Sequence, residues 1–469
     1  MFLFVSSGKK EMNMDIQEKM ERIRPFLETK DYPAIAAILA PSAPVDVGEL
    51  LSNLETEEII AVLSYLPTDV TGEVITYLDP DLAPEIFAAL GEDKGSAVLD
   101  TMYNDDVADI LGELEPEEQN ELLEMMEADD AEDVRELMVY PEDTAGSIMT
   151  TEFVALNQNV TAEEAIQKLR AEAPSAETVY YVYVTNDDEE LVGVLSLRDL
   201  IVTPPNWPVE HIMHTRVKYV TDYTDQEEVA SMVSRYDIMA VPVTDKDHHL
   251  VGIITVDDIL DVIEEEATED VLRMAGSNED ELDEDDTFGE KIVKAVKARL
   301  PWLLITLVGG FVSGFIMNNI EESLEAVVAL AYFIPLLLGL GGNVGTQSST
   351  VTVRGISTGQ VDSSRIFLNV LRESCVGLIA GLCCAVVLCV VAYFWLKSFA
   401  LSILVGITLL CNMFLSAFIG TFVPLVLKRM GIDPAVASAP FISTGIDIIG
   451  LLIYSILAAF FMPFLLGLA

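Results

Sequence analysis

The feature that most constrains this fold is a series of long uncharged runs in the C-terminal part of the chain. A helix needs roughly 20 apolar residues to cross the hydrocarbon core of a bilayer. Uncharged runs at least that long occur at 300–320, 326–353, 374–396 and 398–427, and a fifth, 434–469, is interrupted only by Asp447. The pattern predicts a membrane domain of five helices within residues 291–469.

The basic residues between these runs predict how the helices cross the membrane, because cytoplasmic loops are enriched in Lys and Arg. Basic residues precede the first run, lie between the second and third, and follow the fourth. They are Lys291, Lys294, Lys297, Arg299, Arg354, Arg365, Arg372, Lys428 and Arg429. The other loops hold Asn318, Asn319, Glu321 and Glu322 after the first span and only Lys397 after the third. We therefore expect a multi-pass protein of the cell membrane, with a cytoplasmic N-terminus and the C-terminus outside.

Charge divides the chain near residue 290. Residues 1–290 carry 70 acidic and 16 basic side chains, whereas residues 291–469 carry 7 and 10. A net charge of −51 excludes a nucleic-acid binder that works through a basic face. The composition is 51% hydrophobic, so an acidic disordered protein is also excluded. An acidic soluble part is joined to a nearly neutral apolar part.

A 12-residue repeat occupies residues 31–141, after an N-terminal extension and first helix in 1–30. The repeated apolar positions are Leu54, Leu66, Leu78, Leu90, Met102, Leu114, Met126 and Met138. Three residues after each of the first seven stands an acid: Glu57, Asp69, Asp81, Asp93, Asp105, Glu117 and Asp129. Twelve residues suit a short helix and a tight turn, with the acid favouring the next helix dipole. The repeat predicts a stacked helical solenoid.

A second repeat covers residues 142–205 and 206–262. The stretch "VYVTNDDEELVGVLSLRDL" (182–200) matches "VPVTDKDHHLVGIITVDDI" (241–259) at an offset of 59, and the upstream stretches match at 64. Short strand patterns alternate with amphipathic helices, and the unit resembles a tandem pair of cystathionine-β-synthase-like (CBS) modules. The resemblance implies an ATP or other adenine nucleotide site at Ser196, Asp199, Thr255 and Asp258. The alternative is a pair of modules that bind no nucleotide and serve as a dimer interface.

Residues 256–290 connect the modules to the membrane domain. Ile259, Leu260, Val262 and Ile263 stand among acids, which indicates an acidic connecting helix. The stretch "SNEDELDEDD" (277–286) follows as a loop, and the basic "KIVKAVKAR" (291–299) is expected at the lipid headgroups. An acidic helix beside an acidic solenoid is repelled unless cations intervene.

Two polar interruptions stand out in the membrane half. In "GLGGNVGTQSS" (339–349), the glycines serve close helix packing, or the backbone carbonyls and amide side chains line a wet path. Asp447 costs roughly 2.5–3.5 kcal/mol if it is ionised in mid-membrane. It is therefore either protonated and bonded to a neighbouring helix, or it faces a cation. Because the membrane runs contain no Lys, Arg or His to pair with it, a cation site is the better interpretation.

The order of solenoid, CBS pair, acidic helix and five spans is similar to the MgtE family of magnesium channels. The local matches are "GLGGNVGTQSS", "GIDPAVASAP" and "EATEDVLRMAG". The resemblance implies a homodimer with Asp447 as the pore carboxylate and with Asn343 and Thr346 lining the pore. It also implies regulatory Mg²⁺ ligands in the cytosolic domains, at Glu73, Asp105, Asp109, Asp237, Asp258, Asp261, Glu269 and Asp270.

The function expected from this resemblance is Mg²⁺ uptake through a channel that intracellular Mg²⁺ closes. Mg²⁺ suits carboxylates with retained water. The four His residues are all cytosolic, which argues against a zinc or copper transporter. The alternatives are a broader carrier of Mn²⁺ or Co²⁺ and a membrane-tethered nucleotide sensor. An enzyme is not expected, because no nucleophile–base constellation or Walker-type loop occurs in the sequence.

Overall fold

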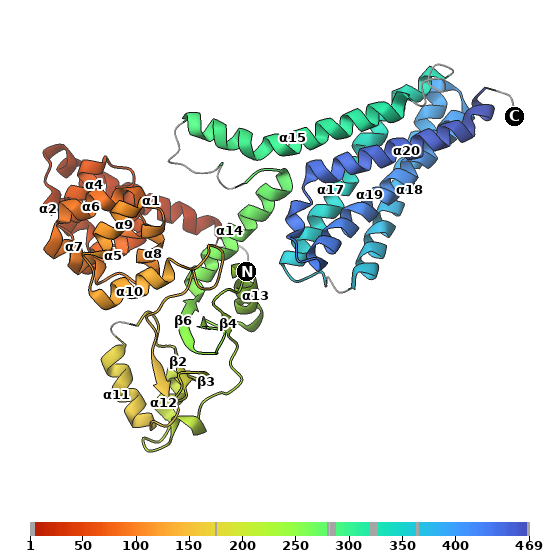
Figure 1. Cartoon of the computed structure of the whole chain (residues 1–469). Helices are drawn as coiled ribbons and strands as arrows, with labels where there is room; N and C mark the ends of the chain where they lie inside the picture. The colour runs from red at the N-terminus through yellow and green to blue at the C-terminus, as the bar shows by residue number, and fades with distance from the viewer. Residues whose placement is uncertain are drawn as a thin grey trace. The chain divides into compact units, whose positions relative to one another are not determined.

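The chain is described here from a computed structural model, which divides into two compact units, Met1–Val262 and Ile263–Ala469 (Figure 1). The structure describes residues 5–173, 176–278, 281, 288–318, 327–362 and 365–466, with side chains from residue 16 onward. The predicted acidic loop 277–286 and the predicted outer loop with Asn319, Glu321 and Glu322 lie largely outside the described residues.

The N-terminal half of the first unit is a stack of short helices. Helix α1 (Val5–Thr29) precedes α2 (Tyr32–Leu39), α3 (Pro44–Leu51), α4 (Thr56–Leu63), α5 (Thr68–Ile75), η1 (Pro80–Leu82), α6 (Ala83–Leu90), α7 (Glu92–Leu99), α8 (Asn104–Gly112), α9 (Pro116–Leu123) and α10 (Ala128–Leu137). From α3 onward a helical element begins every 12 residues, η1 taking the place of a start at position 80. The predicted solenoid is confirmed.

The repeated acids and the repeated apolar residues occupy the positions in the helical stack that the sequence predicts. Each of the seven repeated acids lies in the first turn of its helix, where the helix dipole favours a negative charge. The apolar residues lie in the turn after each helix, apart from Leu90, which is the last residue of α6. They pack on a continuous core, in which Leu66 is 3% exposed. An apolar residue therefore lies at or just after the end of each helix, and an acidic residue lies in the first turn of the next.

The two CBS modules have the same sheet topology. The first contains β1 (Ala155–Asn157), α11 (Ala162–Glu172), β2 (Tyr181–Thr185), β3 (Leu191–Ser196) and α12 (Leu197–Val202). The second contains η2 (Val209–His211), β4 (Val220–Thr221), α13 (Gln226–Tyr236), β5 (Ala240–Thr244), β6 (Leu250–Thr255) and the start of α14 (Val256–Ala275). Each sheet has one parallel and one antiparallel pairing. Tyr181 pairs with Ser196 and Ala240 with Thr255, so the offset of 59 is also an offset in register.

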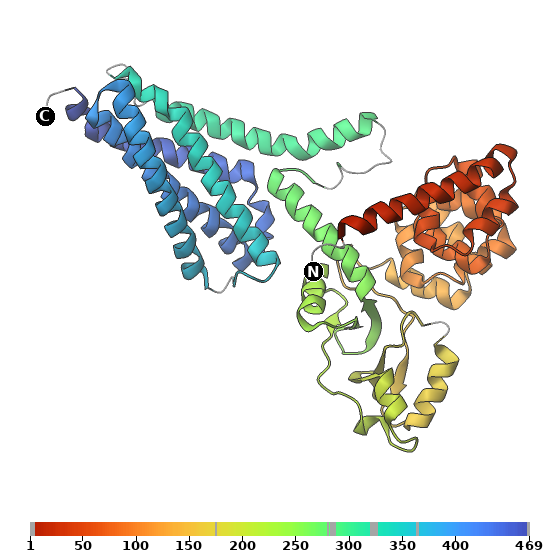
Figure 2. The ribbon, with the colours of Figure 1, turned by 180° about the vertical axis from the view of Figure 1, so that it is seen from behind.

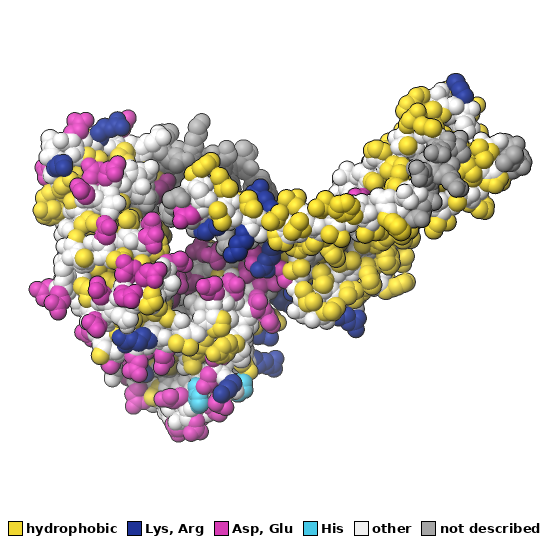
Figure 3. Space-filling view, turned by 45° about the horizontal axis from the view of Figure 1, so that its top comes forward, with side chains coloured by type: hydrophobic (Ala, Val, Ile, Leu, Met, Phe, Trp, Pro, Cys, Tyr) yellow, Lys and Arg dark blue, Asp and Glu magenta, His cyan; other side chains and the backbone are white. Residues whose placement is uncertain are grey.

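Among the described residues of the second unit, five helical segments are long and apolar enough to cross a membrane, judged by length and composition. They are α15 (Phe288–Asn318), η4 with α17 (Val328–Phe333 and Ile334–Ser357), α18 (Ile366–Leu396), α19 (Phe399–Arg429) and α20 (Ala439–Leu465), with η6 (Pro434–Val436) before the last. Helix α15 begins before the basic stretch 291–299, so this stretch belongs to the first long helix. Figure 3 shows hydrophobic side chains over much of this unit, whereas acids are spread over the first unit.

Glycines bring the membrane helices close together. Helix α19 packs against both α17 and α18, and α20 packs on α15, α17 and α19 (Figure 2). A Cβ placed at Gly420 of α19 would overlap the Gly345 carbonyl oxygen, and one at Gly345 of α17 would overlap Ile446 of α20. The segment "GLGGNVGTQSS" is continuous helix. The expectation that its backbone carbonyls line a wet path is therefore wrong, because those carbonyls accept the hydrogen bonds of the helix.

Candidate functional site

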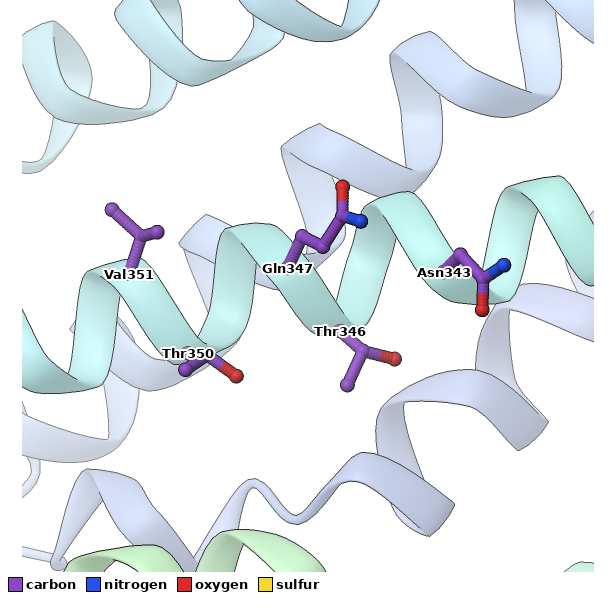
Figure 4. Close-up of a pocket in the computed structure, with 5 residues that line it drawn as sticks. All are labelled: Asn343, Thr346, Gln347, Thr350 and Val351. Atoms are coloured by element: carbon purple, nitrogen blue, oxygen red, sulfur yellow. The ribbon is translucent and has the colours of Figure 1, made fainter.

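A polar pocket lies along α17, at the segment that the sequence singles out. Its volume is about 420 Å³, and it is lined by Asn343, Thr346, Gln347, Thr350 and Val351. Figure 4 shows these side chains arising from successive turns of the helix. Thr346 donates its hydroxyl to Gly342 O at 2.7 Å, so its oxygen is left as an acceptor. The glycines of the same segment pack against other helices, so close packing and the pocket occupy different faces of α17.

Asp447 lies on α20 among apolar residues and is partly buried. Among the residues that the structure describes, no hydrogen bond or ion pair reaches its carboxylate. Its neighbours Ser443 and Thr444 donate their hydroxyls to Pro440 O, at 3.2 and 2.7 Å. Asp447 is not among the residues that line the α17 pocket, although α17 and α20 are in contact through Gly342 and Ser443.

A buried amide that the sequence analysis missed joins α19 to α17. Asn412 of α19 is 1% exposed, and its Nδ2 donates to Leu337 O of α17 at 2.7 Å. Its position inside the uncharged run 398–427 was the available signal, because a polar side chain in a membrane span usually has a partner.

The predicted ligands Glu269 and Asp270 interact with other residues of the second unit. Glu269 forms an ion pair with Arg273 one turn later on α14. Asp270 accepts a hydrogen bond from Ser357 Oγ at 2.9 Å, at the last residue of α17. Burial raises the pKa of the Asp270 carboxyl.

An acidic cluster in the first unit brings two predicted ligands together with three further carboxylates. Glu177, Asp257 and Asp258 place carboxylate oxygens within 4.8 Å of one another. Asp105 and Asp106, at the start of α8, are close enough to perturb this group electrostatically. We call these five residues the acidic cluster.

Burial and mutual repulsion disfavour ionisation within the acidic cluster. Burial, with a smaller contribution from Asp105, raises the pKa of Glu177 to about 8. Burial likewise raises the pKa values of Asp105, Asp106 and Asp258 to about 6. Asp105 Oδ1 and Glu177 Oε2 are buried without a hydrogen-bond donor among the described residues. A hard cation with retained water would satisfy these oxygens, so the donor set fits Mg²⁺.

The other predicted ligands of the first unit are less closely associated. Glu73 and Asp261 both lie near Tyr77, whose pKa is raised by burial and by the surrounding acids. Asp109 follows Asp105 by one turn on α8. Asp237 ends α13 in a left-handed conformation, with φ of 52°, and no interaction among the described residues links it to the acidic cluster.

The residues predicted to meet a nucleotide begin two helices. Ser196 and Asp199 form a reciprocal capping box at α12, with Ser196 Oγ donating to Asp199 Oδ2 at 2.6 Å. Thr255 Oγ1 lies 2.8 Å from Asp258 Oδ2 at the equivalent start of α14. These hydrogen bonds stabilise the helix starts, and Asp258 belongs to both the nucleotide prediction and the acidic cluster.

A further contact fastens the solenoid to the first CBS module beside the acidic cluster. Glu152 Oε2 accepts from the backbone N–H of Asn104 at 3.0 Å, and Asn104 Nδ2 donates to Thr151 Oγ1 at 2.9 Å. Glu152 therefore caps the first turn of α8 from another part of the chain. Burial raises its pKa to about 7.

Three family models match successive regions of the chain. Residues 334–457 match the MgtE family of divalent cation transporters, residues 42–143 match the MgtE intracellular N domain, and residues 145–204 and 209–265 match CBS domains. A solved cytosolic domain of the Mg²⁺ channel MgtE in complex with ATP is 39% identical, covering 51% of this chain and 98% of that one, with a TM-score of 0.49.

Two curated relatives are similar over most of their length. The magnesium transporter MgtE of Bacillus subtilis is 41% identical over 326 residues, which cover 70% of this chain and 71% of the relative. The protein of the same description from Thermus thermophilus is 43% identical over 319 residues, which cover 67% and 69%. On this identity and coverage, the chain belongs to the MgtE family of transporters.

Proposed function

We propose that this protein carries Mg²⁺ across the cell membrane through a path that includes Asp447. The observation that carries the proposal is the position of this carboxylate, on an apolar helix without a protein partner among the described residues. An ionised carboxylate in the membrane marks an ion pathway by default. The family relatives that are named magnesium transporters support Mg²⁺ as the cargo.

The path is completed by the polar face of α17. Asn343 and Thr346 offer an amide and a hydroxyl oxygen, and Gln347 and Thr350 extend the same lining. Mg²⁺ dehydrates reluctantly, so neutral oxygens that contact its water shell suit its passage better than a closed cage of carboxylates. In a homodimer, a two-fold axis would bring two copies of Asp447 to one hydrated ion.

Cytosolic Mg²⁺ closes the path by binding to acids of the first unit and the connecting helix. The acidic cluster is the best-supported position, because two of its buried carboxylate oxygens have no donor among the described residues. A bound cation offsets the repulsion among these acids and stabilises the closed arrangement, and its loss shifts the population towards the open one. The remaining proposed ligands are Glu73, Asp109, Asp237, Asp261, Glu269 and Asp270.

The N-terminal unit faces the cytoplasm and the C-terminus lies outside, as the distribution of Lys and Arg favours. ATP bound at Ser196, Asp199, Thr255 and Asp258 would tune the gate. The same side chains form the capping hydrogen bonds at α12 and α14.

The test is Mg²⁺ uptake by the purified full-length protein in liposomes, compared between the parent, Asp447→Asn and Asp447→Ala. We expect both variants to lose most of the flux, because neither supplies a charge to the ion. Asp362→Asn, at an exposed acid between α17 and α18, is the control for removal of an acid from the membrane unit. Normal flux and selectivity in Asp447→Ala would exclude the proposed path. Competition by Mn²⁺ and Co²⁺ in the same assay distinguishes a magnesium transporter from a broader divalent carrier.

A further inference from the structure

The amide of Asn412 lies at the junction of three membrane helices. It projects from α19, donates to Leu337 O of α17 at 2.7 Å, and is 1% exposed. No water is available in such an interior to replace a lost hydrogen bond. The bond therefore restrains α17 and α19 more strongly than an equivalent bond at a wet surface would.

Two glycines leave the space that this amide occupies. A Cβ at Gly341 of α17 would overlap Asn412 Nδ2, and a Cβ at Gly450 of α20 would lie 2.9 Å from Asn412 Oδ1. The amide is thus packed directly against the backbones of both helices. Any larger residue at Gly341 or Gly450 would have to displace it.

The same two helices carry the groups of the proposed ion path. Gly341 precedes Asn343 by two residues, and Gly450 follows Asp447 by three. Residues two apart in an α-helix point to nearly opposite sides, so Asn412 contacts the face of α17 opposite to Asn343, which lines the pocket. Asn412 therefore contacts α17 on the face away from the pocket and does not line the pocket.

We propose that Asn412 is a positioning residue for ion selection. By bonding α19 to α17 and packing against Gly450 of α20, it sets the separation between the polar face of α17 and the Asp447 carboxylate. An ion site needs its groups placed to within about 0.5 Å, so a small relaxation of these helices alters which ion passes. This inference rests on the proposed role of Asp447 in transport.

The test compares Asn412→Leu with Tyr454→Phe in the full-length protein. Tyr454 of α20 is also 1% exposed, and its hydroxyl donates to Leu330 O at 2.7 Å, so each variant removes one buried hydrogen bond of equal length. The readouts are thermal stability in detergent and the ratio of Mg²⁺ to Ca²⁺ flux in liposomes. We expect Asn412→Leu to lower this ratio by about tenfold or more, since small misplacements have large effects. Tyr454→Phe should keep it within about twofold.

A second set of variants applies if Asn412→Leu does not fold. Gly341→Ala inserts a methyl group against the amide, and adding Asn412→Ala removes that overlap without restoring the hydrogen bond. We expect Gly341→Ala to lower the flux ratio and the double variant to stay low. Gly339→Ala is the matched control, because no atom lies within 4 Å of a Cβ there.

Three outcomes would overturn the inference: an unchanged ratio in Asn412→Leu, an equal fall in Tyr454→Phe, or full selectivity in the double variant. The Asp447→Ala variant, measured in parallel, separates this result from the proposed function. If Asp447→Ala blocks flux while the Asn412 variants select normally, only the positioning role fails. If Asp447→Ala transports normally, both the proposed ion path and the positioning role of Asn412 are excluded.

Discussion

Arg273 Nη1 lies 2.7 Å from Asp433 Oδ2, so the last turn of α14 is tied to the residue that caps η6 just before α20. The same guanidinium contacts Glu269, and the neighbouring Asp270 holds Ser357 at the end of α17. The connecting helix therefore contacts the end of α17 and the short turn just before α20. A movement of α14 would reach α17 and α20 directly.

Loss of this ion pair should weaken closure of the path. Arg273 and Asp433 are 42% and 33% exposed, so the pair contributes at most about 1 kcal/mol. We expect Arg273→Ala to raise by a few-fold the internal Mg²⁺ concentration that halves uptake. Asp433→Asn should act similarly, and the double variant should add little, because both remove one contact. Arg216→Ala, at an exposed arginine of the first unit, is the control. A fully additive double variant would argue against coupling through this pair.

The acidic cluster should make the metal-free protein less stable as the pH rises. The Glu177 pKa is about 8 in the fold against an ordinary value of 4.5, so the folded chain retains a proton that the unfolded chain loses between these values. The contribution is complete below about pH 4.5 and lost above about pH 8. Calorimetry in a chelator should show Tm falling across this window, with a shallower fall in Glu177→Gln. Mg²⁺ should restore Tm at pH 8. Equal slopes in parent and variant would contradict the assignment.

Close packing at Gly420 should be intolerant of a methyl group. The added Cβ of Gly420→Ala would meet the Gly345 carbonyl oxygen, which belongs to a rigid helix backbone. Forcing α17 and α19 apart should cost about 1–3 kcal/mol. Thermal unfolding in detergent measures this loss, and Gly445→Ala, where a Cβ has no neighbour within 4 Å, should be close to the parent. Equal stability of the two variants would exclude the close approach.

Lys94 should stabilise the solenoid from within. Its Nζ donates to Leu63 O, Ser64 O and Leu66 O, at 3.1, 2.8 and 3.1 Å, so it satisfies carbonyls at the end of α4. Lys94→Met keeps the aliphatic stem and removes these donors, which should cost roughly 1.5–3 kcal/mol. The exposed Lys246→Met serves as the control in the same thermal melt. A loss no larger than that of the control would show that water replaces the ammonium group.

Local patterns were enough to predict the architecture of this chain. The 12-residue period, the repeat offset of 59 and the lengths of the uncharged runs each reflect helix or strand geometry within one segment, and the fold confirmed all three. The polar stripe of α17 was predictable for the same reason. Asn343 and Thr346 lie one turn apart, so a pocket that contains one contains the other.

The sequence by itself therefore determined the kinds of element, their order, and the position of Asp447 within an otherwise uncharged run. Only the tertiary structure determined which acidic side chains lie close together. Glu177 lies 80 residues from Asp257, and no period connects them, so their contact follows from how the two CBS modules pack. Asn412 was equally hidden, because its significance depends on glycines in two other helices. The geometry of a helix or strand imposes a periodic pattern on the sequence of its own segment. A contact between distant segments imposes no such pattern.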